Sequence, residues 1–300
     1  MTARAWGLFA AVAVLWGVPY LFIGLALRDL GAMTVVAGRV VIGAMVLVPV
    51  VAWWCRPWPS LRGRWGRLVV VAVVEVAVPF TLIALGELTV ASGPTGVIIA
   101  TEPLFVLLIA WALRDRDRDR VPTRAWWGLA VGFTGVVALV GFSGAGAGVP
   151  LIVGAAASYA LGAVLVGRWF ADLPGLVVAA VMLLIAAVPC TVLAMLLDPA
   201  PSASVTAITA VVVLGAACTA VGFASFFALI ASAGAARAAL ITYAAPVVAT
   251  IAGAVVLDET VTLATLAAIA LVLAGAVLAT HRPDPTPGHR ASEPAPEPGL

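Results

Sequence analysis

The stretch GVIIATEPLFVLLIAW, residues 96–111, decides the fold class, because nearly all of its residues are apolar. A transmembrane helix needs about 20 such residues, and the apolar run extends to 93–113. Glu102 and Pro103 interrupt it, one with a charge and the other by removing a backbone hydrogen-bond donor. An ionisable residue in a span costs about 2.5–3.5 kcal/mol and usually faces a cavity or a partner. The stretch therefore predicts a spanning helix whose interruption needs an explanation.

The composition of the whole chain agrees with a membrane location. Of its 300 residues 64% are hydrophobic and only 10% are charged, and the mean hydropathy is +1.18. These values predict an integral membrane protein. The net charge of +2 gives no reason to expect nucleic acid as a partner. The three widely spaced cysteines and two histidines near the C-terminus predict neither a disulfide framework nor a metal site.

The apolar runs predict an all-α membrane protein with ten transmembrane helices. Clusters of Arg, Asp, Pro and Gly separate these runs. The first run is longer than a signal-peptide core of about 7–15 residues, and we interpret it as an uncleaved span. The predicted spans are 6–27, 33–54, 67–88, 93–113, 124–142, 149–168, 175–197, 205–232, 235–257 and 261–280.

Arginine placement predicts the orientation. With ten spans and the N-terminus inside, 14 of the 16 basic residues fall at the inner side. Positive residues favour the cytoplasmic side of a membrane, so both termini are expected in the cytoplasm of a plasma (inner) membrane protein. RDRDRDR, residues 114–120, then reads as a solvated cytoplasmic loop. SGAGAGVP, residues 143–150, is a flexible outer linker, and residues 281–300 are a disordered tail.

The chain repeats itself weakly at an offset of 143 residues. Five equivalent pairs are Asp29 and Asp172, Phe80 and Phe223, Pro103 and Pro246, Asp115 and Asp258, and Gly132 and Gly275. The repeats, residues 5–142 and 149–280, would each hold five helices. Because five is odd, the second repeat enters the membrane from the opposite side. Two inverted five-helix repeats are typical of transporters that work by alternating access.

The sequence resembles the EamA-type drug/metabolite transporters over residues 5–280. The similar stretches of the first half are LWGVPYLFIGLAL (15–27), AGRVVIGAMVLVP (37–49) and TEPLFVLLIAW (101–111). Those of the second half are GAAASYALGAVLVGR (154–168) and GAARAALITYAAPVVATIAGAVVLDETVT (234–262). The resemblance implies ten helices in two repeats and the transport of amino acids, sugars, drugs or other metabolites. The charged run LRDRDRDR (113–120) departs from the short turn typical of the family.

The paired prolines and the buried charges predict a central binding site. Pro103 and Pro246 would each leave a backbone carbonyl unpaired near mid-membrane, which a cavity or a packing kink must accommodate. At about 1.5 Å per residue, Arg39 lies about 9 Å and Glu102 about 14 Å below the outer surface. They would hold the carboxylate and ammonium of an amino-acid-like substrate, or form a structural ion pair between spans two and four. Glu102 is alternatively a proton site.

Two further glutamates and six aromatic residues are also considered for the central site. Glu75, in the inner half of span three, is either a proton or cation site or a residue facing inner water, and Glu87 is interfacial. The aromatic candidates for the substrate cavity are Trp16, Tyr20, Phe80, Tyr159, Phe223 and Tyr243. Packing or interfacial anchoring is the alternative for each of them. Gly132 and Gly275 would allow close helix contact, within one chain or in a homodimer.

We therefore expect a secondary transporter that exports a small metabolite such as an amino acid. The alternative within transport is uptake or exchange of another metabolite, a drug or a lipid-like substrate. The alternative outside transport is a non-transporting membrane sensor or a membrane enzyme. An enzyme is disfavoured because the short cytoplasmic loops offer only Arg, Asp, Ser and Thr. The expected partners are a small-molecule substrate and membrane lipid, with no cofactor and no direct use of ATP.

Overall fold

The computed structural model describes residues 1–54, 61–113, 123–143, 146–198 and 203–280, and within these ranges every regular element is helical. The expected tail 281–300 and the charged run 114–120 lie outside the described residues. In the first half the helices are α1 (Ala3–Gly17), α2 (Pro19–Ala26), α3 (Ala32–Trp54), α4 (Trp65–Ala72), η2 (Val73–Ala77), α5 (Val78–Gly86), α6 (Ser92–Ile99), α7 (Glu102–Ala112) and α8 (Thr123–Ser143). In the second half they are α9 (Val149–Trp169), α10 (Gly175–Leu197), α11 (Val205–Val212), η4 (Val213–Val221), α12 (Gly222–Ala233), α13 (Ala235–Ala238), α14 (Ile241–Val256) and α15 (Leu263–Thr280).

Seven of the described helical segments are long and apolar enough to cross a membrane. They are Ala3–Ala26, Ala32–Trp54, Trp65–Gly86, Ser92–Ala112, Val149–Trp169, Gly175–Leu197 and Val205–Ala233. Ile241–Val256 and Thr265–Ala279 are shorter apolar helices. The chain is thus a multi-pass membrane protein, since helices satisfy their own backbone hydrogen bonds in lipid.

Several of these segments are not the uninterrupted α-helices that the apolar runs suggested. Val18 separates α1 from α2 just before Pro19, and Ala100 and Thr101 separate α6 from α7 just before Pro103. Gly234 ends α12 with a φ of +86°, a conformation that glycine adopts at little cost. This is where the eighth and ninth apolar runs nearly touch in the sequence. Breakers inside a run therefore bend the chain without ending the hydrophobic segment.

Two segments are π-helical, and the 143-residue offset relates them. η2 corresponds to residues 216–220, which lie within η4. In η2 the N–H of Val78 bonds to the carbonyl of Val73, five residues back. Pro79 follows η2 and has no N–H for the carbonyl of Glu75, four residues earlier, which favours the wider turn there. π-helical turns are often found at functional sites, and η2 carries the charged residue Glu75.

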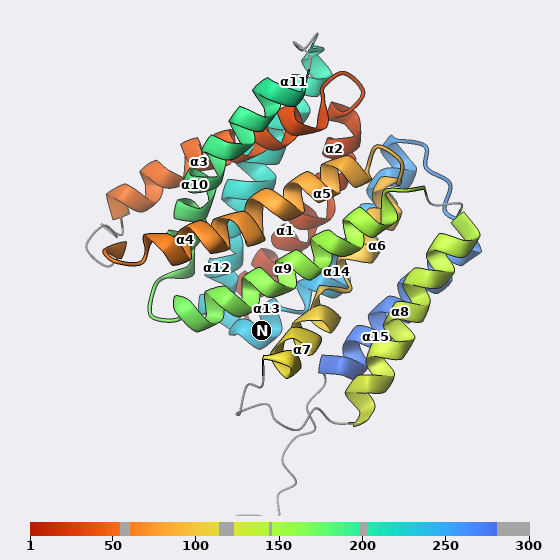
Figure 1. Ribbon diagram of the computed structural model, residues 1–300. Helices are drawn as coiled ribbons and strands as arrows, with labels where there is room; N and C mark the ends of the chain where they lie inside the picture. The colour runs from red at the N-terminus through yellow and green to blue at the C-terminus, as the bar shows by residue number, and fades with distance from the viewer. Residues whose placement is uncertain (55–60, 114–122, 144–145, 199–202, 281–300) are drawn as a thin grey trace, which may run out of the picture.

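Helices from the two halves pack against each other throughout the bundle (Figure 1). α3 packs on α10 and η4, α5 on α9, α6 on α14, and α1 on α12 and α14. α8 and α15 lie side by side at one flank. There Gly275 meets the backbone of Gly132, so close that a side chain on Gly275 would collide with it. These two glycines therefore serve close packing within one chain, one of their two expected roles.

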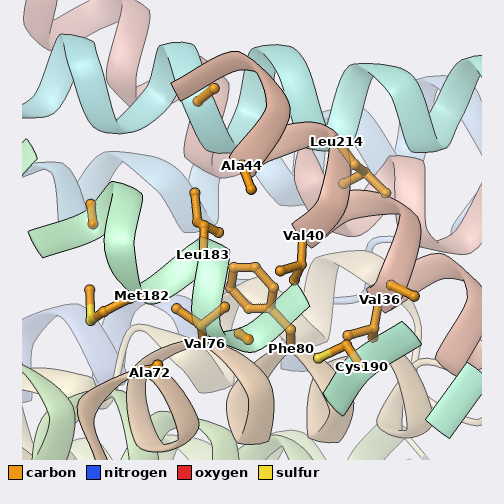
Figure 2. Close-up of a cluster of buried hydrophobic side chains, with 14 of the residues drawn as sticks. Val36, Val40, Ala44, Ala72, Val76, Phe80, Met182, Leu183, Cys190 and Leu214 are labelled. Atoms are coloured by element: carbon orange, nitrogen blue, oxygen red, sulfur yellow. The ribbon is translucent and has the colours of Figure 1, made fainter. Parts of the chain in front are cut away.

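The main core lies between α3, α5, α10 and the π segments. Figure 2 shows Phe80 surrounded by Val36, Val40, Val76 and Leu183, and all of these side chains are buried. In lipid such contacts stabilise the bundle through close packing, because there is no gain from removing apolar surface from water. The core holds the ring of Phe80 in a fixed position, which is important for the site beside it.

Candidate functional site

Arg39 is the centre of the candidate site. It lies on α3 and is buried, with 8% of its surface exposed. Its Nε donates a hydrogen bond of 3.0 Å to Oγ1 of Thr219 in η4, and its guanidinium carbon lies 3.7 Å from the centre of the Phe80 ring. A cation over an aromatic face is attracted by the ring's negative surface. The guanidinium is therefore held from two sides, by one side chain of each half.

Thr219 is itself fixed by the backbone of the π segment. Its hydroxyl donates a 2.8 Å hydrogen bond to the carbonyl of Leu214, five residues earlier. The same oxygen accepts the hydrogen bond from Arg39. Thr219 directly follows Cys218, which is the repeat equivalent of Glu75. One π segment thus positions the buried arginine, and the other carries a buried glutamate.

A structural ion pair between Arg39 and Glu102, the alternative to a substrate site, is not present in the described structure. None of the carboxylates in the described part of the chain lies within 4.0 Å of the Arg39 guanidinium nitrogens. Depth along a helix, from which that alternative was inferred, does not give the direction of a side chain, and Arg39 points toward η4 and Phe80. Its charge instead acts on Tyr20, Tyr159 and Glu87. The terminal guanidinium nitrogens are therefore available to an acidic group of a ligand.

Tyr159 lies within electrostatic range of Arg39 and of two glutamates. It lies on α9, half-buried, with its ring 6.4 Å from that of Phe80 in an edge-to-face arrangement. Its hydroxyl interacts electrostatically with Arg39, Tyr20, Glu75 and Glu102. The structure therefore brings six of the predicted residues into one region, namely Tyr20, Arg39, Glu75, Phe80, Glu102 and Tyr159.

Trp16 and Phe223 form the repeat-related counterpart of the Tyr159–Phe80 pair. Trp16 corresponds to Tyr159, and Phe223 to Phe80, at the offset of 143. The rings of Trp16 and Phe223 lie 6.0 Å apart, again edge to face. In both pairs the first helical segment of one half contacts the third segment of the other half. The four aromatic residues thus form two equivalent contacts between the halves.

The remaining predicted residues lie in different surroundings. Pro103 opens α7 after the break at Thr101, whereas Pro246 is inside the continuous helix α14. The two prolines therefore do not make equivalent breaks, contrary to expectation, because the interruption before α14 falls earlier, at Ala239 and Leu240. Tyr243 packs against the apolar cluster around Leu104, Leu129, Ala276 and Ala279.

Two residues beside Glu75 were missed by the sequence analysis. A side chain at Gly162 of α9 would collide with the Glu75 carboxylate, so the glycine leaves a recess for it. One turn earlier, the hydroxyl of Ser158 donates a 2.6 Å hydrogen bond to the carbonyl of Val74. The motif GAAASYALG contains both residues, but nothing in its composition indicates which glycine or serine faces η2.

An open groove lies elsewhere, between α14 and α15. Its lining consists of aliphatic side chains and Thr250, among them Val247, Ile251, Val255 and Leu266. Such a surface suits a hydrocarbon chain better than a polar metabolite. The charged region around Arg39 is therefore the better candidate for a substrate site.

The sequence model of the EamA-like transporter family matches residues 4–141 and again residues 146–280. The chain belongs to this family. It is 25% identical over 272 residues to the uncharacterized transporter YvbV of Bacillus subtilis strain 168, with 89% of this chain and 88% of YvbV covered. It is 23% identical over 283 residues to an uncharacterized transporter of Archaeoglobus fulgidus, covering 93% of this chain and 99% of that one.

A solved crystal structure shares the fold of this EamA-family chain. It superposes with a TM-score of 0.65 at 22% sequence identity, covering 93% of this chain and 98% of the other. The family membership and these relatives make the protein a membrane transporter. The residues around Arg39 are therefore a candidate transport site.

Proposed function

We propose that this protein is a secondary active transporter that exports a small metabolite such as an amino acid by alternating access. Its ten transmembrane helices form two inverted five-helix repeats in the plasma (inner) membrane, with both termini in the cytoplasm. The arginine asymmetry and the 143-residue offset support this arrangement. The two equivalent aromatic contacts, Phe80 with Tyr159 and Trp16 with Phe223, support it as well.

The observation that carries the proposal is the buried Arg39, which has no carboxylate partner among the described residues. A buried cation is stable when hydrogen bonds or a counter-ion compensate its desolvation. Thr219 and Phe80 compensate only part of it, and a substrate carboxylate would complete the set through two parallel hydrogen bonds. Arg39 therefore binds the acidic group of the substrate.

The surrounding side chains suit the rest of an amino-acid-like molecule. Glu102, half-buried at the start of α7, offers a negative charge for an ammonium group. The rings of Phe80 and Tyr159 beside Arg39, and that of Tyr20, offer apolar surface. Trp16, Phe223, Pro103 and Pro246 would border the rest of the proposed path, and Tyr243 would border it from the apolar cluster around Leu104. Bound substrate would contact both halves, as alternating access requires.

The test is efflux from proteoliposomes loaded in turn with radiolabelled amino acids and other small metabolites. We expect wild-type protein to release one class carrying a carboxylate, and Arg39→Lys to slow its release at least about tenfold, because lysine cannot make the two parallel bonds. Arg28→Lys, an exposed exchange of the same kind, is the control and should release substrate as wild type does.

Each other outcome selects an alternative. Substrate that is accumulated and not released indicates uptake, and flux that requires substrate on both sides indicates exchange. Release of an uncharged or lipid-like compound that Arg39→Lys leaves unchanged would overturn the role of Arg39. If no compound crosses although the protein is folded, a sensor becomes the better interpretation.

A further inference from the structure

Glu75 occupies an unusual backbone position. It is the central residue of η2, the π-helical turn of the third apolar segment. Pro79 removes the hydrogen-bond donor that the Glu75 carbonyl would have in an α-helix. The neighbouring carbonyl of Val74 accepts its hydrogen bond from Ser158 of α9. A side chain from the other half of the chain therefore holds the turn that carries Glu75.

The side chain of Glu75 fits into a recess of the other half. Gly162 lies opposite, and any larger residue there would occupy the space of the carboxylate. Oε2 of Glu75 is buried and accepts no hydrogen bond from any described residue. An ionised carboxylate is unfavourable in such surroundings, because no donor among the described residues compensates a charge on the buried Oε2. This arrangement therefore fits a protonated carboxyl group.

In the part of the chain that the structure describes, no cation pairs with Glu75. Glu102 of α7 adds a further negative charge, and Tyr159 of α9 is a phenol within electrostatic range of Glu75. Two arginines lie on helices that pack against η2. Arg67 of α4 lies over the ring of Trp169, and Arg168 is exposed at the end of α9. A proton is thus the simplest source of neutrality.

We infer that Glu75 is the proton-binding site that couples transport to the proton gradient, a role that rests on the proposed transport function. The carboxylate takes up one proton on one side of the membrane, forms the neutral acid that fits beside Gly162, and releases the same proton on the other side. Glu102 remains with the substrate. The proton and the substrate then have separate sites on the two sides of Tyr159.

The recess suits a proton better than a metal ion. Hard metal ions bind six or more oxygen ligands, whereas here the adjacent Val74 carbonyl is already bonded to Ser158 and the opposite wall is a glycine. No group of three or more His, Cys, Asp or Glu side chains gathers in the described residues. The inference therefore names a proton.

Infrared spectroscopy of the full chain in liposomes tests the protonation without any substrate. The carbonyl stretch of a protonated carboxyl shifts when water is replaced by heavy water, which separates it from the backbone bands. We expect wild-type protein at neutral pH to show such a band, and Glu75→Gln to lose it. The matched variant Glu102→Gln should retain it. Both carboxyl oxygens of Glu87 are also buried without a donor among the described residues, so the contribution of Glu75 is read by repeating the comparison in a Glu87→Gln background. A band unchanged in folded Glu75→Gln would overturn the inference.

A second variant and a flux measurement complete the test. Gly162→Ala leaves Glu75 in the chain but fills its recess, so the band should weaken or move; if Glu75→Gln does not fold, this variant decides. In the proteoliposomes of the proposed function, Glu75→Gln should retain exchange and lose acceleration by a pH gradient. Acceleration that survives in Glu75→Gln would overturn the coupling role. If wild type moves none of the compounds, the transport proposal fails while the infrared result still decides protonation.

Discussion

The two ends of the helix bundle are joined by different chemistry, although the repeat places equivalent residues there. We name them the Asp198 end, where α2, α10 and α14 finish, and the Arg64 end, where α4 begins and α9 finishes (Figure 1). Asp29 and its repeat equivalent Asp172 each bond to the other half. Asp29 accepts a hydrogen bond from the Ser204 hydroxyl, whereas Asp172 pairs with Arg64 at 2.8 Å.

At the Asp198 end, carboxylates of the second half cap helices of the first half. Asp198 accepts a 2.6 Å hydrogen bond from the backbone N–H of Thr34 in the first turn of α3. Glu259 accepts from the N–H groups of Ser92 and Gly93 in the first turn of α6, at 2.8 and 3.0 Å. Negative charge at a helix N-terminus satisfies unpaired donors and favours the helix dipole. These contacts are partly buried.

The Arg64–Asp172 pair of the opposite end is exposed, with 32% and 57% of the two side chains accessible. Exposed ion pairs contribute little to stability, since water screens them and long side chains lose freedom. The polar contacts between the halves are therefore weaker at the Arg64 end than at the Asp198 end. In the proposed orientation the Arg64 end is the cytoplasmic end, where an exporter must admit its substrate.

Of the substitutions at the two ends, Glu259→Ala at the Asp198 end is expected to lower the stability of the protein most. It removes the acceptor of two N–H groups and the negative charge at the start of α6, which costs about 2–3 kcal/mol of stability. Denaturant titration of the purified protein in mixed micelles measures the loss. Asp258→Asn is the control, because Asp258 is exposed and asparagine tolerates its positive φ of 55°. Equal stability of the two variants would contradict the capping role.

A smaller effect is expected from Asp198→Ala, since Asp198 accepts from only one N–H, that of Thr34. We expect a loss of about 1–2 kcal/mol, measured in the same titration. Asp198→Asn keeps an acceptor without the charge and should lie between wild type and alanine. If asparagine is as unstable as alanine, the contribution of Asp198 is its charge rather than the hydrogen bond.

The position of most helices could be predicted from the sequence, because long apolar runs are sufficient to identify them. The repeat offset predicted which aromatic residues correspond, and the structure pairs Phe80 with Tyr159 and Trp16 with Phe223. The π segments were not predictable, since the same composition also suits an α-helix. The partners of Arg39 were not predictable either, because they depend on which helix faces α3.

The helix caps at the Asp198 end could not be predicted from the sequence either. Each joins residues more than 160 positions apart, Thr34 with Asp198 and Ser92 with Glu259. Glycines leave the necessary space, as a side chain at Gly31 would collide with Asp198 and one at Gly253 with Glu259. A sequence shows acidic residues at helix ends but not the helix that they cap. Only the packing of the two halves identifies it.

The direct comparison of the equivalent aspartates uses Ser204→Ala and Arg64→Gln. Ser204 bonds to Asp29 and also accepts from the N–H of Ala207, so it caps α11 while joining the halves. Ser204→Ala should lower the free energy of unfolding by about 1 kcal/mol. Arg64→Gln should change stability less, because the ion pair is exposed. The same titration compares them, and a larger loss in Arg64→Gln would reverse the assignment of the weaker end.

The smallest effect is a dependence on pH at the Arg64 end. The hydrogen bond from Arg64 lowers the pKa of the Asp172 carboxyl below its usual value of 3.8. A carboxyl whose pKa is lower in the folded state stabilises the protein above its unfolded pKa, and this stabilisation disappears as the pH falls through the folded value. Arg64→Gln should return the pKa of Asp172 toward 3.8, which carbon NMR of labelled aspartate measures, with Asp172→Asn for assignment. The stability difference between wild type and Arg64→Gln should then vanish in acid and shrink in high salt. A difference that persists in acid would mean that Arg64 stabilises this end through a contact other than Asp172.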